Sequence, residues 1–344
     1  MKQKKNLALI IGSLFLLLFF SIFASLFVGS VHLDFVSTVK ILVNQLPGIE
    51  LAPDWEISDE MIIINLRLPR IILASLVGAM LSISGVAFQG VLRNPLADPY
   101  ILGVSSGAAL GAASTLIFVP DLSLFGHFTL PIFAFLGAMM ALGFVVLLAK
   151  RQYYRGSETL ILAGVIVQSL MGAVLSFLIT ISDNKLQSII FWLMGSLANH
   201  DWTDILVLIP YFLFGTIFLL FQYKDLNVLA LGENAATYLG MEVGKQKVRI
   251  LTIASLLAAS AISIVGIIGF VGLIIPHILR VLFGANHRIL LPVSVLAGSV
   301  FLILTDTLAR TMIPSSEIPI GVLTAFLGAP FFAYLFYKNR NGRG

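Results

Sequence analysis

The stretch Asn6–Val28, NLALIIGSLFLLLFFSIFASLFV, contains no charged side chain. An α-helix rises 1.5 Å per residue, so about 20 apolar residues cross the roughly 30 Å of hydrocarbon in a bilayer. Val207–Phe221 and Leu290–Leu304 repeat this character further along the chain. These runs predict helices that span a membrane.

The composition of the whole chain leads to the same conclusion. Of 344 residues, 58% are hydrophobic and only 11% are charged, whereas soluble domains have about 25% charged residues. The absence of cysteine excludes disulfide scaffolds, thiol nucleophiles and cysteine-ligated metals. The net charge of +4 does not indicate nucleic-acid binding, because the basic residues lie at the ends of apolar runs and form no single patch.

The alternation of apolar runs and polar breaks predicts an all-α membrane protein with about ten transmembrane helices in one domain, residues 1–344. The opening Met-Lys-Gln-Lys-Lys is typical of a secretory signal, but the apolar run after it is longer than the usual 7 to 15 residues. We therefore expect it to remain as the first helix. The expected spans lie near residues 7–29, 66–91, 100–119, 130–149, 158–181, 203–221, 249–268, 270–283, 289–310 and 318–337.

The distribution of basic residues predicts the topology. If the N-terminus is inside, few of the 21 basic residues fall on the outer side, as the positive-inside rule requires. The outer ones are Lys40, Arg67, Arg70, Lys185 and Arg310. We expect both termini in the cytoplasm and a multi-pass protein of a bacterial cell membrane.

Two polar breaks are too long to be simple turns. The outer break, residues 31–65, is acidic and hydrophilic and is expected as an external loop. The inner break, residues 222–248, is expected as short helical pieces interrupted at Gly232, Gly240 and Gly244.

Motifs for chemistry are absent. The chain has no GxxxxGK[ST] and no HExxH, and its five histidines are scattered without carboxylate partners at metal-ligand spacing. We therefore expect no enzyme activity and no catalytic, cofactor or metal site. Asp306 is the main ionisable group at mid-membrane, and Arg310 one turn later can pair with it. This scarcity of buried carboxylates disfavours an ion-coupled secondary transporter.

Stripes of small residues recur on three expected helices. Gly103, Gly107 and Gly111 predict close helix packing. The face formed by Gly164, Gln168, Gly172 and Ser176 fits either a solute pathway or another close helix contact. Gly321, Thr324 and Gly328 form a similar face.

Many segments together resemble the FecCD family, the permeases of iron-siderophore, haem and vitamin B12 importers. The resemblance covers nearly the whole chain from Leu66 on. Its marks are Leu66–Arg70, Gly85–Gln89, Asn94–Pro99, Leu102–Val104, Leu160–Gly164, Phe191–Gly195, Leu229–Gly240, Gly269–Arg280, Glu317–Gly321 and Gly328–Pro330.

This resemblance implies the permease of a type II ABC importer. The family implies a second permease, either an identical copy or a paralogue, two cytoplasmic ATPases that bind ATP and Mg, and an external solute-binding protein. We expect an iron(III)-siderophore-type chelate as the solute, because no fixed charge lies on the proposed stripes. Haem and vitamin B12 remain the alternatives within the family.

The resemblance also implies an inner gate and a coupling helix. Asn94 and Leu96 match the family's inner gate, and Ser157 and Thr159 lie near the corresponding start of the fifth helix. The inner segment can form a short helix whose apolar surface fits a groove in the ATPase. The expected coupling residues are Leu231, Gly232, Glu233, Ala235, Tyr238, Leu239 and Gly240.

Three outer arginines form the last candidate site. We expect Arg67, Arg70 and Arg310 at an exposed outer rim, where guanidinium forks suit carboxylates of another protein. The resemblance implies that they receive acidic residues of the solute-binding protein. The alternative is local neutralisation: of Arg310 by Asp306 or Glu317, and of the other two by the acidic segment that ends at Glu60 or by lipid headgroups.

Overall fold

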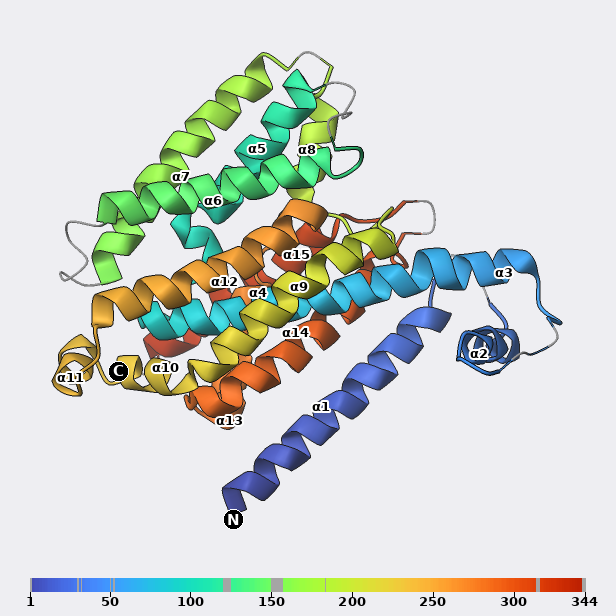
Figure 1. Cartoon of the computed structure of the whole chain (residues 1–344), viewed down its shortest axis with the longest axis horizontal. Helices are drawn as coiled ribbons and strands as arrows, with labels where there is room; N and C mark the ends of the chain where they lie inside the picture. Colours follow the sequence, from blue (N-terminus) through green and yellow to red (C-terminus); the bar gives the residue numbers. More distant parts are fainter. Residues whose placement is uncertain are drawn as a thin grey trace.

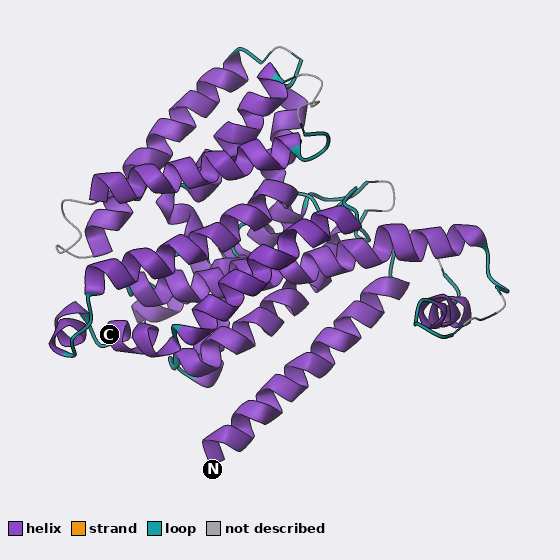
Figure 2. Ribbon diagram, viewed as in Figure 1, coloured by secondary structure: helices purple, strands orange, loops and turns teal. Residues whose placement is uncertain are grey.

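The computed structural model describes residues 2–29, 31, 33–49, 51, 53–119, 125–149, 157–182, 184–313 and 316–341, and these are helical almost throughout (Figure 2). Within these ranges the only β feature is an isolated bridge between Phe125 and His127. The α-helices are α1 Lys2–Phe27, α2 Phe35–Asn44, α3 Ile57–Met61, α4 Leu68–Leu92, α5 Val104–Phe118, α6 Thr129–Ala149, α7 Ser157–Thr180, α8 Leu186–Met194, α9 Trp202–Phe221, α10 Tyr223–Ala230, α11 Glu233–Tyr238, α12 Val243–Val265, α13 Val271–Phe283, α14 His287–Ala309 and α15 Ile320–Asn341. A π-helix, η1 Ile62–Arg67, precedes α4, and a 3₁₀-helix, η2 Pro99–Leu102, precedes α5.

The all-α class is confirmed. Each of the ten expected spans overlaps a helix, namely α1, α4, α5, α6, α7, α9, α12, α13, α14 or α15. Seven helical stretches of the described chain are long and apolar enough to cross a membrane unaided, whereas the apolar parts of α5, α13 and α15 are shorter. The number of crossings therefore stays a prediction.

Helix α4 forms the centre of the bundle, with α12, α13 and α14 packed around it (Figure 1). Glycines permit this close packing. A Cβ atom on Gly78 would lie 2.2 Å from the carbonyl oxygen of Gly298 in α14, and one on Gly85 would lie 2.0 Å from that of Gly272 in α13. Only hydrogen fits at these crossings, which is how membrane helices bring their backbones together.

Helices α5 to α8 form a second group beside this centre (Figure 1). Gly107 and Gly111 of α5 face the backbone of Gly137 and Phe133 in α6, where a Cβ atom would lie 2.3 Å and 2.1 Å from a carbonyl oxygen. The predicted packing role is confirmed for Gly107 and Gly111. Gly103 instead takes a left-handed conformation, with φ of 77°, between η2 and α5.

The two long polar breaks are largely helical. On the outer side, α3 continues through η1 into α4, so that Ile57–Leu92 is one helix of 36 residues, longer than a bilayer requires. On the inner side, α10 and α11 end near Gly232 and Gly240, which have φ of 113° and 84°. The predicted break at Gly244 is wrong, because Gly244 lies inside α12.

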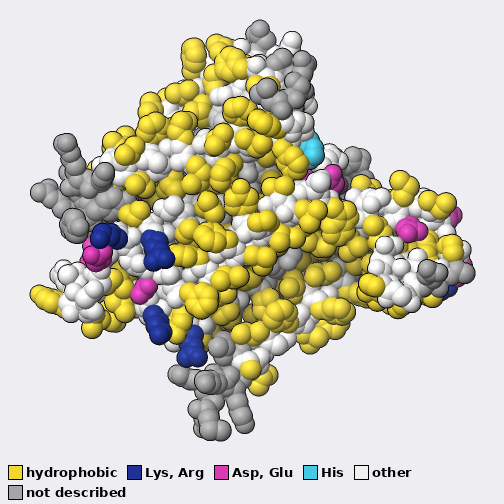
Figure 3. All heavy atoms as spheres, viewed as in Figure 1, with side chains coloured by type: hydrophobic (Ala, Val, Ile, Leu, Met, Phe, Trp, Pro, Cys, Tyr) yellow, Lys and Arg dark blue, Asp and Glu magenta, His cyan; other side chains and the backbone are white. Residues whose placement is uncertain are grey.

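Basic side chains gather at one end of the face seen in Figure 3. Figure 3 shows Lys and Arg gathered at the end where α10 and α11 lie, while hydrophobic side chains cover the middle of this face. Both chain termini point toward that same end (Figure 1). By the positive-inside rule we call it the inner end.

Candidate transport and coupling sites

The three outer arginines come together, but as a buried cluster. They line a cavity of about 350 Å³ at the outer end. Arg70 donates from Nε and Nη2 to Asp306 at 2.9 to 3.1 Å and from Nη1 to Glu317 at 2.9 Å. The Arg70 side chain is 14% exposed and that of Asp306 is 1% exposed. Arg310 lies 4.0 Å from the same carboxylate.

Other donors of the cluster also bond within the chain, whereas Nε of Arg310 is buried without a hydrogen-bond partner among the described residues. Arg310 donates to the backbone carbonyl and the hydroxyl of Ser25 in α1. Arg67 donates to the carbonyl oxygens of Leu26 and Val31. These bonds fasten α1 and the segment after it to the start of α4 and the end of α14.

The expectation of exposed guanidinium forks is therefore wrong for this conformation. Local neutralisation of Arg310 by Asp306 agrees with the alternative expectation. For Arg70 that expectation is wrong, because Asp306 and Glu317, and not the acidic segment, neutralise it. Arg67 donates to backbone carbonyls. Docking of a binding protein at this cavity stays a prediction. Glu317 is 49% exposed. The variant Glu317→Gln therefore tests docking without burying a new charge. The quantity to measure is the salt dependence of binding-protein association.

Helix α11 presents an apolar surface at the inner end. Tyr238 is 91% exposed, and Leu231 and Leu239 are also exposed. Ala235 is half-buried. Gly232 and Gly240 border the helix with positive φ, so the segment projects as a compact unit. This geometry agrees with the predicted shape of a coupling helix, while its contact with an ATPase stays a prediction.

Glu233 connects α11 to the bundle and does not belong to its free surface. The buried Nζ of Lys247 in α12 donates to the Glu233 carboxylate. Arg93, the residue that ends α4, lies 3.8 Å from the same carboxylate. Local spacing does not predict either contact, because Arg93 follows α4 and Lys247 lies in α12, both outside the helix that carries Glu233.

The Asn94–Pro99 segment forms a tight turn between α4 and η2. The side chain of Asn94 accepts a hydrogen bond from the backbone N–H of Leu96 at 2.9 Å, and the Leu96 side chain is exposed. Asp98 accepts from the backbone N–H of Tyr100 at 3.0 Å. Burial raises the pKa of Asp98 to about 6, against the lowering effect of that backbone bond. Arg93 directly precedes this turn and lies 3.8 Å from Glu233 of α11. This ion pair connects the predicted gate to α11.

The predicted stripe on α7 divides into two parts. Gly164 packs against η2, where a Cβ atom would lie 2.1 Å from the carbonyl oxygen of Ile101. Gly172 faces open space, Ser176 is exposed and Gln168 is half-buried. The C-terminal half of the stripe is thus available to a pathway. Thr159 is half-buried, and the side chain of Ser157 lies outside the described part of the structure.

The similar face on α15 is closed. Thr324 is fully buried and bonds the carbonyl oxygen of Gly321. A Cβ atom on Gly321 would lie 2.3 Å from the carbonyl oxygen of Met194, and one on Gly328 would lie 2.3 Å from the ring of Phe270. The pathway prediction for Thr324 is therefore wrong for this conformation, since helix packing explains the stripe.

The statement that the histidines lack carboxylate partners is also wrong. Nδ1 of His200 lies 2.7 Å from Oδ2 of Asp204, one helical turn later. His127, distant in sequence, lies close to Asp201 and Asp204. The interval from His200 to Asp204 was readable as an i,i+4 pair, whereas the approach of His127 was not.

The protein is a bundle of apolar helices with an open α7 face and a projecting inner helix. These features are those of a membrane-embedded transport subunit. Residues 16–338 match the FecCD transport family. The chain belongs to this family and is a membrane permease of an ABC importer. Members of the family work with ATPase and binding-protein components.

Individual relatives agree with this assignment. The chain is 43% identical to the uncharacterized ABC transporter permease protein YvrB of Bacillus subtilis, over 99% of this chain and 96% of the relative. It is 45% identical to the cobalamin import system permease protein BtuC of Halobacterium salinarum, over 80% of this chain and 73% of the relative. A solved ABC transporter in an inward-facing conformation, provisionally assigned to the metal-chelate type, is 37% identical, with a TM-score of 0.81 and coverage of 96% of this chain and 99% of that one.

Proposed function

We propose that this permease moves an iron(III)-siderophore-type chelate into the cytoplasm, along the interface with a second permease, while a partner ATPase hydrolyses ATP. The observation that carries this proposal is the scarcity of charged side chains on α7 and α8, the helices that we propose to lie beside the solute pathway. Within Ser157–Thr180 of α7 the only charged residue is Glu158, in the first turn, and Leu186–Met194 of α8 has none. A small ion would need charged or closely spaced polar ligands, so a large and weakly charged solute fits better.

A second feature supports a bulky solute. A cavity of about 680 Å³ lies between α8, the segment that precedes α13, and α15, lined by apolar side chains that include Met194, Phe270 and Phe326. The similar solved transporter provisionally assigned to the metal-chelate type favours the same class of cargo. Cobalamin is the second candidate, because a 45% identical relative is a cobalamin import permease.

Uptake by cells that lack this chain distinguishes the candidates. We expect deletion to abolish uptake of a radioactive ferric hydroxamate chelate, and a plasmid copy to restore it. Uptake of haemin and of labelled cobalamin should not change. Loss of cobalamin uptake alone would replace the proposed substrate while leaving the importer class intact.

Cysteine labelling examines the proposed wall on α7, in a chain that has no cysteine of its own. We expect Gly172→Cys and Ser176→Cys to react with a water-soluble maleimide in one transport state and to be protected in another, because a pathway opens alternately. Gln168→Cys should react more slowly, since its position is half-buried.

Two variants serve as controls for this experiment. Thr324→Cys replaces a fully buried side chain and should not react. Leu170→Cys lies on the opposite side of α7, two residues or about 200° from Gly172, and should face lipid. Equal reaction at Ser176 and Leu170 in every state would show that the stripe does not line a pathway.

A further inference from the structure

A mixed histidine and carboxylate cluster lies where the beginning of α6 approaches the beginning of α9. His127 comes from the connection before α6, Asp201 caps the N-terminus of α9, and Asp204 lies in the first turn of α9. One ligand atom from each residue lies within 4.8 Å of the other two. In Figure 3 a histidine and acidic side chains lie close together on this face of the molecule.

The carboxylates of the cluster are held in place by local bonds. Oδ1 of Asp201 accepts from the backbone N–H of Thr203 at 2.8 Å and from that of Asp204 at 3.4 Å. Asp204 is buried, and its Oδ2 lies 2.7 Å from Nδ1 of His200. A histidine N–H that orients a metal-ligating carboxylate is a common outer partner of metal sites.

His127 has a different environment. Its ring is exposed, and among the described residues no hydrogen bond reaches it, although it contacts the ring of Phe128. His127 therefore offers an imidazole nitrogen close to two anchored carboxylates, and the three side chains together form a candidate ligand set. Imidazole nitrogen with carboxylate oxygen suits divalent transition metals, and three protein ligands leave a fourth position for water.

We propose that His127, Asp201 and Asp204 bind a divalent transition-metal ion of the zinc class, with His200 as the outer partner that positions Asp204. This ion is a resident of the outer end and is separate from the transported chelate. None of its ligands comes from α7, whose stripe is the proposed wall of the pathway, and none lines the cavity beside α8 and α15.

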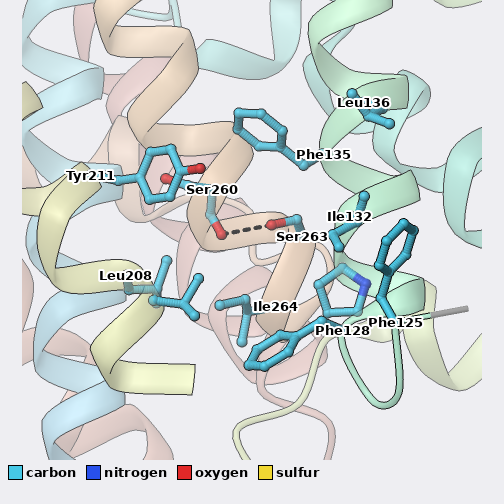
Figure 4. Close-up of a pocket in the computed structure, with 12 residues that line it drawn as sticks. Phe125, Phe128, Ile132, Phe135, Leu136, Leu208, Tyr211, Ser260, Ser263 and Ile264 are labelled. Carbon is cyan, nitrogen blue, oxygen red and sulfur yellow. Dashed lines mark hydrogen bonds between the residues drawn. The ribbon is translucent and has the colours of Figure 1, made fainter. Parts of the chain in front are cut away.

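The position of the site gives the ion a mechanical consequence. Phe125 and Phe128, on either side of His127, line an apolar cavity of about 590 Å³ together with Leu208, one turn after Asp204 (Figure 4). Residues of α6, α9 and α12 line this cavity. A metal ion bound by His127 and by the start of α9 therefore links the connection before α6 to α9 at the edge of the cavity. This link should resist separation of α6 from α9.

Zinc titration of the full-length protein tests the proposal. The protein is purified with a tag that contains no histidine, placed in lipid nanodiscs and titrated by calorimetry with zinc chloride. We expect one zinc ion per chain and a melting temperature that rises with zinc, because a ligand that binds only the folded state stabilises it. Cobalt in place of zinc should give the visible absorption of a low-symmetry site.

The variants separate ligation from folding. Asp201→Asn retains a good helix cap while removing the anionic ligand, and His127→Gln changes an exposed side chain, so both should fold. Each is expected to weaken zinc binding at least tenfold and to abolish the zinc-dependent rise in melting temperature. His200→Gln should weaken binding about 10- to 100-fold, as is usual for an outer partner.

His277→Gln is the matched control, because His277 lies in α13 beside Phe331 and Phe332 and away from the cluster. It should bind zinc like the parent. Unchanged zinc affinity in His127→Gln, or no saturable binding by the parent, would overturn the proposal. Neither result would affect the chelate-uptake experiment, so failure of the metal site and failure of the proposed function are distinguishable.

Discussion

The variant Asp306→Asn is expected to destabilise the permease by about 3 to 5 kcal/mol, because it leaves buried guanidinium charge without its partner. Asp306 accepts hydrogen bonds from Nε and Nη2 of Arg70, and its carboxylate lies 4.0 Å from Arg310. An amide oxygen still accepts one hydrogen bond but supplies no negative charge. The measurement is the thermal unfolding midpoint in lipid nanodiscs, followed by tryptophan fluorescence.

Glu317→Gln provides the matched control for Asp306→Asn. Glu317 accepts from the same arginine at a similar distance, but half of its side chain is exposed to solvent. Exposed ion pairs contribute about 0 to 1 kcal/mol, so we expect a small change. The double variant Arg70→Met, Asp306→Asn should recover part of the loss, since it removes one unpaired charge. Equal midpoints for Asp306→Asn and Glu317→Gln would contradict a structural role for the buried pair.

This cluster also shows where sequence reasoning stops. The i,i+4 spacing correctly suggested that Asp306 and Arg310 are neighbours, because spacing reports contacts on one helix. The stronger partner of Asp306 is Arg70, which lies 236 residues earlier in α4. Only the packing of α14 against α4 brings these two together, and no periodicity in a single helix encodes that packing.

The membrane helices were predictable for a simple physical reason. A bilayer requires long apolar runs with satisfied backbone groups, and helices satisfy them. Small-residue stripes were less informative, because the same pattern permits packing or a pathway. Gly107 packs against α6, Gly172 faces open space and Thr324 is buried. The neighbour of each stripe decides between the two roles, and it lies on another helix.

The inner segment was half predictable. Its exposed apolar side chains follow from local spacing: Tyr238 ends α11, and Leu231 and Leu239 flank it. The connection from Glu233 to Lys247 and Arg93 did not follow, because it requires α11 to fold back onto α12 and α4. That connection changes what a substitution of Glu233 measures, from ATPase docking to transmission within the permease.

Substitutions on the two sides of α11 are therefore expected to fail in different ways. Tyr238→Ala with Leu239→Asp removes exposed apolar surface, and interface anchors of this kind contribute about 2 kcal/mol or more each. We expect at least a tenfold loss of affinity for the ATPase, with loss of transport and an unchanged unfolding midpoint. Binding of the purified ATPase to the permease in nanodiscs measures this directly.

Glu233→Gln should retain ATPase binding, because the exposed face of α11 is unchanged, but it loosens the connection to Lys247 and to the turn after Arg93. We expect ATP hydrolysis to continue while chelate uptake falls severalfold. The conservative variant Tyr238→Phe preserves the apolar surface and should resemble the parent in both assays. The proposed division of roles fails if Glu233→Gln loses ATPase binding as fully as the surface variant, or if the surface variant transports normally. In the first case Glu233 would act at the ATPase interface itself, and in the second case α11 would not be the docking helix.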